Sequence, residues 1–245
     1  MQQSFLQRNR TGLLWAGALV VVVVLGVLFY LQSTAPAYAC GTEWTAQPTP
    51  SPLPGATPRL GYLQDDMGRD HVNPGTVVKY ISCPPASGNH YAEPAGPITP
   101  RLYGPNDRAL PEGWVHNLEH GGLVVLYKCP GDACTSSGQT ALQQLWASWP
   151  ASPVCNIPPH EISPVIARFD DMAYPYVAIV WDQVLPLQTL DTQQILAFFA
   201  QQDERTNPEH QCATPSGSPS AGGSSLPSVA PASTEPSPSP AASPG

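Results

Sequence analysis

The pattern of apolar and polar positions divides the chain into an apolar N-terminal run, a mixed core and a polar tail. The first region is an uncharged stretch, GLLWAGALVVVVVLGVLFYL, inside residues 11–32. About 20 apolar residues, each rising 1.5 Å in a helix, cross a hydrocarbon core of ~30 Å. This run therefore predicts a single transmembrane anchor at 11–32.

Basic residues give the orientation expected for this anchor. Arg8 and Arg10 precede the run, and the next Lys or Arg is Arg59. Because positive charge is retained on the cytoplasmic side, residues 1–10 are expected in the cytoplasm. Everything after the anchor is then expected outside, at the cell membrane.

Two alternatives export the same domain without leaving the anchor intact. Ala37-Tyr38-Ala39 has the small-x-small pattern of a signal-peptide cleavage site. Cys40 directly after it leaves open a lipid attachment at the new N-terminus. The apolar run exceeds the usual h-region of about 7–15 residues, which favours an uncleaved anchor.

The middle region alternates between strand-like and helix-like patterns. Short runs of apolar and β-branched residues predict strands, and apolar residues at helical spacing predict helices. The expected order is a strand at 76–82, an ordered loop at 84–115, a strand at 123–128, a helix at 140–149, strands at 162–169 and 176–182, and a helix with Asp191 as its N-cap. This order indicates an α+β fold: a small mixed or antiparallel sheet, two helices packed on one face, and long ordered loops.

Proline-rich segments flank this core. Residues 33–58, which include TAQPTPSPLPGATP, predict a stiff, extended spacer. Residues 213–245 consist mostly of Pro, Ser, Ala and Gly, with one charge, and predict a disordered tail. Residues 59–212 remain as one exported globular domain, long enough to bury a sizeable core.

Composition excludes some classes of function. The formal net charge is −8, and only 11% of the residues are charged. Without a basic surplus to neutralise phosphates, the chain is not expected to bind nucleic acid. A coiled coil is also excluded, because the charges that flank such a seam are missing.

Six cysteines fit an oxidising compartment, where disulfides are the default. The loop from Cys129 to Cys134 is short and rich in turn residues, so these two are the best candidate pair. Cys155 and Cys212 are a second candidate pair. Spacing leaves the rest of the connectivity open.

The densest chemical signal is VHNLEHGG at 115–122. His116 and His120 are four residues apart, which places both imidazoles on one face of a helical turn and suits a single metal ion. Glu119 is placed to orient a ligand imidazole from behind. The two glycines that follow require the helix to be short.

Histidines upstream strengthen the interpretation as a metal site. His71 and His90 lie in the loop-rich part before this motif. Neutral imidazole suits copper and zinc, and a thioether adds a preference for Cu(I). Met67 and Met172 are candidate soft ligands, although filling the core is their more usual role.

Three motifs at this spacing resemble the family called domain of unknown function 3105. The matching segments are His71-Val72, PPASGNHY at 84–91 and VHNLEHGG at 115–122, with the strand at 177–181 and Asn207-Pro208-Glu209 in agreement. The resemblance covers about residues 60–212 and implies one N-terminal anchor with an exported domain. It implies no activity, and it supports His71, His90, His116, Glu119 and His120 as the polar set of the family.

The leading hypothesis is an exported domain, tethered to the membrane by one helix, that binds one transition metal, copper ahead of zinc. Its ligands are His71, His90, His116 and His120. The first alternative is a zinc hydrolase, because the string also matches H-x-x-E-H with Glu119 as base. The second is a structural or partner-docking module without metal. The absence of a nucleophile elbow or dinucleotide motif argues against an enzyme.

Overall fold

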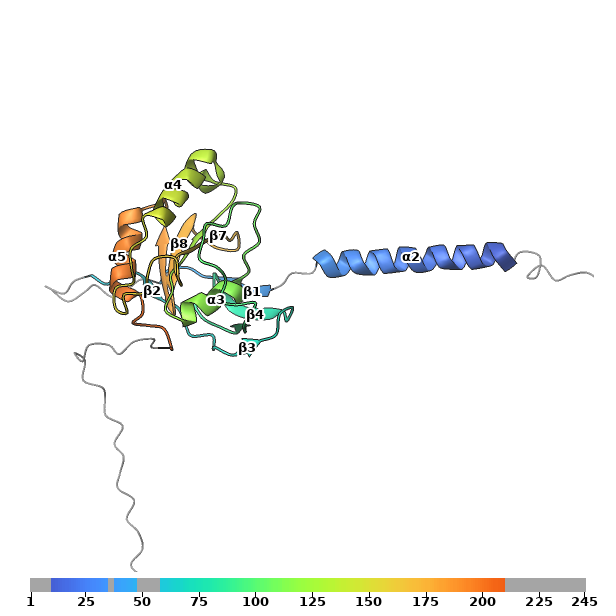
Figure 1. The fold of residues 1–245 in the computed structure, drawn as a ribbon, viewed down its shortest axis with the longest axis horizontal. Coiled ribbons are helices and arrows are strands. Elements are labelled where there is room, and N and C mark those ends of the chain that lie inside the picture. The colour runs from blue at the N-terminus through green and yellow to red at the C-terminus, as the bar shows by residue number, and fades with distance from the viewer. Residues whose placement is uncertain (1–9, 35–37, 48–57, 210–245) are drawn as a thin grey trace, which may run out of the picture. The chain divides into compact units, whose positions relative to one another are not determined.

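The computed structural model of the protein describes residues 10–34, 38–47 and 58–209 (Figure 1). The helices are α2 (Arg10–Thr34), α3 (Pro111–Glu119), α4 (Ser136–Ala147) and α5 (Thr192–Gln202), with a short 3-10 helix η1 (Asp132–Cys134). The strands are β1 (Tyr38–Glu43), β2 (Tyr62–Leu63), β3 (His71–Val72), β4 (Val78–Cys83), β5 (His90–Tyr91), β6 (Val124–Tyr127), β7 (Val165–Arg168), β8 (Tyr176–Val180) and β9 (Gln183–Leu187). Of the expected spacer at 33–58, residues 35–37 and 48–57 lie outside the described residues, as does the expected tail at 213–245.

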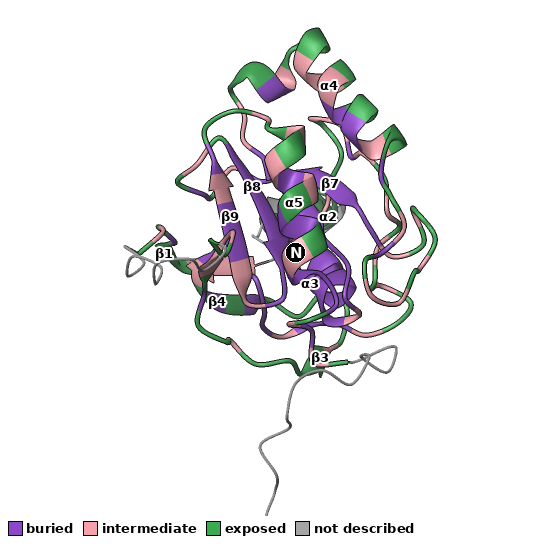
Figure 2. Ribbon diagram, turned by 90° about the vertical axis from the view of Figure 1, so that its left-hand side faces the viewer, coloured by how far each residue is buried: buried purple, intermediate pink, exposed green. Residues whose placement is uncertain are grey.

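A five-stranded mixed sheet, in the order β2-β9-β8-β6-β7, forms the centre of the domain. β6 pairs in parallel with β7 and antiparallel with β8. β8 is buried along its whole length (Figure 2), as is β6. Their continuous apolar sequences fit strands covered on both faces. The α+β class and the mixed sheet expected from the sequence are confirmed.

Alternate residues of the sheet point into two separate apolar layers. Val125 and Tyr127 face the layer that holds α4 and α5, so the two expected helices share one face. Val124 and Leu126 face the opposite layer, which contains Trp114 of α3. The sequence predicted only a short helical turn at 116–120 after a loop at 84–115, whereas α3 already begins at Pro111; this helix carries part of the candidate site.

The folded part of the chain begins before the expected boundary at residue 59. β1 pairs in parallel with β4, and Cys40 and Cys83 form a disulfide between them. Trp44 is buried against the core beside this pair. Because the sulfur of Cys40 is used in this bond, it does not carry the lipid considered above.

The other disulfides agree with the sequence as far as they are described. Cys129 and Cys134 are bonded, which confirms the first candidate pair. Cys155 is also disulfide-bonded. Its expected partner, Cys212, lies outside the described residues.

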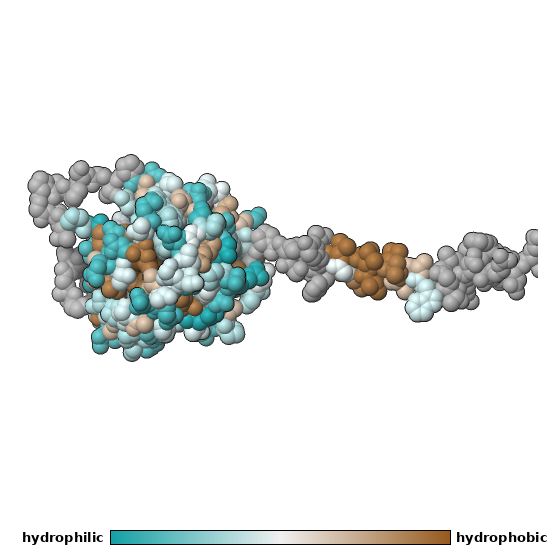
Figure 3. All heavy atoms as spheres, turned by 90° about the horizontal axis from the view of Figure 1, so that it is seen from above, coloured by the Kyte–Doolittle hydropathy of each residue, from teal (hydrophilic) through white to brown (hydrophobic). Residues whose placement is uncertain are grey.

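The N-terminal helix, α2, coincides with the expected anchor. Its side chains at 14–27 are exposed and mostly apolar (Figure 3). Among the described residues, no helix combines the length and the apolar character needed to cross a membrane. The transmembrane anchor at 11–32 therefore stays a prediction.

Candidate metal centre

Two short strands and one helix bring the candidate residues together. β3 and β5 pair in parallel with His71 directly opposite His90, although 18 residues separate them in the chain. His116 and Glu119 lie on the last turns of α3, which has Pro111 in its first turn and ends at Glu119. A proline is well tolerated at this position because the first N–H groups of a helix have no partner within it.

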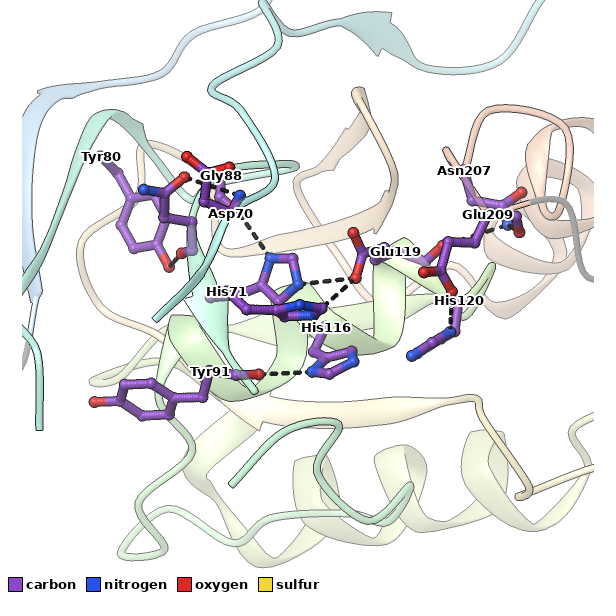
Figure 4. Close-up of polar contacts among 12 residues, drawn as sticks. Asp70, His71, Tyr80, Gly88, Tyr91, His116, Glu119, His120, Asn207 and Glu209 are labelled. Atoms are coloured by element: carbon purple, nitrogen blue, oxygen red, sulfur yellow. Dashed lines mark hydrogen bonds and ion pairs between the residues drawn. The ribbon is translucent and has the colours of Figure 1, made fainter. Parts of the chain in front are cut away.

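Four side chains form one compact group: His71, His90, His116 and Glu119. One ligand atom from each lies within 4.8 Å of all the others. The three imidazole centroids are 4.8–4.9 Å apart. Figure 4 shows His71, His116 and Glu119 pointing toward one another. The sequence hypothesis required that distant histidines converge, and His71, His90 and His116 do so.

Backbone carbonyls fix the orientation of the two buried rings. Nδ1 of His90 donates to the carbonyl oxygen of Gly88 at 2.8 Å, and Nδ1 of His116 donates to that of Tyr91 at 2.6 Å. A carbonyl oxygen only accepts hydrogen bonds, so Nδ1 carries the proton in both rings. When such a ring is neutral, its Nε2 therefore carries the lone pair that can bind a metal ion. Such outer contacts typically hold a metal-binding imidazole in place.

Glu119 lies inside the group, whereas the sequence placed it behind the ligands. Its Oε2 is 2.9 Å from Nε2 of His90 and 3.3 Å from Nε2 of His71. With the proton of His90 on Nδ1, its Nε2 and the carboxylate oxygen are two acceptors facing each other. This contact is favourable only when a proton or a cation lies between them.

Burial favours the neutral form of the His116 ring, which is the form that binds metals. Burial has the largest effect on the pKa of His116 and lowers it, and the neighbouring imidazoles lower it further, against the hydrogen bond to Tyr91. A lowered pKa means that the neutral imidazole persists to lower pH. Neutral imidazole is the form that ligates a metal ion.

The comparison with known proteins places this site within a family segment. Residues 71–216 match the family described as "Protein of unknown function (DUF3105)". The chain belongs to this family. No curated protein and no solved structure matches it. All four residues of the site fall inside the DUF3105 segment, which begins at His71.

His120, the fourth histidine expected as a ligand, lies within the DUF3105 segment but beside the group of His71, His90, His116 and Glu119. Its ring stacks on that of His116, with centroids 4.7 Å apart, and its Nδ1 is 2.7 Å from Oε2 of Glu209 (Figure 4). Asn207, which is buried, contacts the carbonyl oxygens of both Glu119 and Glu209. Asn207 therefore joins the C-terminal segment to the end of α3. No sequence spacing indicated this contact, since 88 residues separate Asn207 from Glu119.

Met67 and Met172 of this DUF3105 protein have core roles. Met172 is fully buried, and Met67 is partly buried, both in the apolar layer of α3. His160 stacks on Trp146 and is outside the four-residue metal-binding group. His210 lies outside the described residues.

A single glycine tests the orientation of His116 without removing a ligand. A Cβ at Gly96 would lie 2.7 Å from the carbonyl oxygen of Tyr91 and 2.9 Å from Nδ1 of His116. We expect Gly96→Ala to disturb this hydrogen bond and weaken metal binding by about 10–100-fold, the usual effect of losing such a contact. The measurement is competition for the metal with a coloured chelator.

Gly104→Ala is the matched control in this DUF3105 chain. A Cβ there would meet only Oδ2 of Asp107, at 4.0 Å. Its metal affinity is expected to equal that of the wild-type protein. Equal affinity in Gly96→Ala as well would show that the Tyr91 contact does not orient a ligand.

Proposed function

We propose that this protein binds one divalent transition-metal ion through His71, His90, His116 and Glu119. The observation that carries the proposal is the convergence of four donor atoms within 4.8 Å. Two of the imidazoles are almost completely buried, with His90 0% and His116 3% exposed. Burying facing acceptors is unfavourable unless a positive charge pairs with them. A metal ion supplies that charge and satisfies all the lone pairs at once.

The donor set favours copper(II) ahead of zinc(II). Three nitrogens and one oxygen make a borderline set that suits both ions. Affinity for a given site of this kind generally rises from Zn²⁺ to Cu²⁺. No thiolate belongs to the group in the described part of the chain, so no thiolate in it selects Cu(I).

We also propose that the site is displayed outside the cell on an uncleaved anchor. Two disulfides are described, Cys40–Cys83 and Cys129–Cys134, and Cys155 is also disulfide-bonded. Oxidised cysteines fit an exported domain. Cleavage after Ala39 would divide β1 and remove Tyr38. That residue stacks on Phe169 and donates to Asp171, so the fold uses the segment that cleavage would discard.

The zinc hydrolase with Glu119 as base has less support. Oε2 of Glu119 already contacts two imidazole nitrogens, which is the position of a ligand. The helix that carries the motif ends at Glu119, after nine residues. The inverzincin motif normally lies on a longer helix that carries both histidines.

Metal analysis of the full-length protein tests this proposal. The protein is extracted from the membrane fraction without an affinity-tag histidine run, dialysed free of chelator and titrated with Zn²⁺ and then Cu²⁺. We expect one ion per chain, with Cu²⁺ displacing Zn²⁺. Less than about 0.3 ion per chain with either metal would contradict the proposed site, and recovery in the soluble fraction would contradict the anchor.

A further inference from the structure

The four residues of the site differ sharply in exposure. The side chain of His71 is 47% exposed, that of Glu119 is 5% exposed, and that of His90 is fully buried. The donors of His90, His116 and Glu119 are therefore buried, and His71 lies on the solvent side of the site.

The same residue also lacks the contact that fixes the other rings. Within the described residues, the polar side-chain contact of His71 is to Glu119, a member of the site itself. His90 and His116 are each held from behind by a backbone carbonyl. An exposed side chain with no such contact changes rotamer on the picosecond-to-nanosecond timescale, without any unfolding.

The local backbone allows this motion and the local charge favours a cation. β3 has only two residues and pairs only with β5 in the described sheets. The residues on both sides of it, 68–70 and 73–77, are exposed. The exposed carboxylates of Asp65, Asp66 and Asp70 precede His71 and outnumber the one exposed cation among them, Arg69, and such local negative charge raises the concentration of cations.

We propose that His71 is the exchangeable ligand, through which a hydrated divalent ion such as Cu²⁺ or Zn²⁺ enters and leaves the site. This inference rests on the proposed function and makes the protein one that takes up and releases its metal, in contrast to a structural site that stays closed. When the ring of His71 rotates outward, water takes its place on the ion. His90, His116 and Glu119 keep the ion bound until a competing ligand removes it.

The experiment measures how fast the zinc-loaded, full-length protein gives up its ion to excess chelator. In parallel, the unfolding rate is measured under the same conditions. We expect release from the wild-type protein to be faster than unfolding. In His71→Ala, one ion is still bound per chain, with affinity about 10–100-fold lower and release at least about tenfold faster.

Two further variants separate a ligand from a structural role. His71→Asp supplies a carboxylate in place of the imidazole that can also bind the ion, so its release rate is expected to lie between wild type and His71→Ala. His90→Ala removes a buried ligand and is expected to leave no measurable binding.

Each contrary result has a distinct meaning. Release that matches the unfolding rate, or that is unchanged in His71→Ala, would overturn the exchange mechanism and leave the metal site intact. Complete loss of metal in His71→Ala, as in His90→Ala, would also overturn it. A wild-type protein that binds no metal would instead refute the proposed function itself.

Discussion

Replacement of His90 by Ala is expected to abolish measurable binding of Cu²⁺ or Zn²⁺, a loss of affinity of at least about 100-fold and more than the usual loss of an outer contact. Nε2 of His90 is 2.9 Å from Glu119, and its ring centroid is 4.8–4.9 Å from those of His71 and His116. No water replaces the missing nitrogen easily, because the side chain is fully buried. The measurement is a titration of the full-length protein against a competing chelator.

A second variant guards against simple misfolding of His90→Ala. Glu119→Gln keeps the size of the side chain and removes its charge, so the fold is retained while one charged donor is lost. We expect an affinity at least about tenfold lower, since a charged contact is stronger than a neutral one. The melting temperature in excess chelator reports whether each variant is folded.

His160→Ala is the matched histidine control. The ring of His160 stacks on Trp146, and its Nε2 contacts the carbonyl oxygen of the same residue, outside the metal group. Its metal affinity is expected to be that of the wild-type protein. If His90→Ala behaved like His160→Ala, the four-residue group would not be the binding site.

The central sheet was accessible from the sequence because its signals are local. The run at 123–128 contains no charge before Lys128 and became β6, buried on both faces. Asp191 accepts from the N–H of Gln194, as an N-cap residue does. β9 gave no such signal because Pro186 interrupts its apolar pattern, yet it pairs with β8 on one side and β2 on the other.

The candidate site was accessible only in part, because its geometry depends on pairing between distant segments. The helical spacing of His116 and His120, with Glu119 between them, was visible in the sequence, but His120 lies outside the four-residue group. The position of His71 opposite His90 depends on the pairing of two-residue strands, which carry no periodicity. The same holds for the contact of His120 with Glu209, which depends on where the chain after α5 returns.

Glu112 gives the chain a second testable property, which is independent of the metal. This carboxyl is fully buried in the first turn of α3. Burial raises its pKa from 4.5 to about 7. The folded protein therefore keeps a proton between these two pH values that the unfolded chain has already released.

The sign of the pH dependence follows from this difference. Where the folded state binds more protons, the free energy of unfolding falls as the pH rises. One pKa unit corresponds to about 1.4 kcal/mol, so Glu112 is expected to reduce the stability by about 3 kcal/mol between pH 4.5 and 8. The loss is complete above pH 7 and absent below pH 4.5.

Glu112→Gln is expected to abolish this part of the pH dependence. The amide carries no charge at any pH, so urea unfolding in excess chelator should show a smaller loss of stability between pH 4.5 and 8 than in the wild-type protein. The slope decides the result, because any constant effect of burying the amide cancels. Asp182, whose pKa burial raises to about 6, contributes equally to both proteins.

Glu161→Gln provides the control, because Glu161 is exposed. Its pH profile is expected to follow that of the wild-type protein. Superimposable profiles for Glu112→Gln and the wild-type protein would mean that Glu112 is ionised in the folded state. In that case a positively charged partner must reach it, and the first turn of α3 must be more accessible than its burial against β4 indicates.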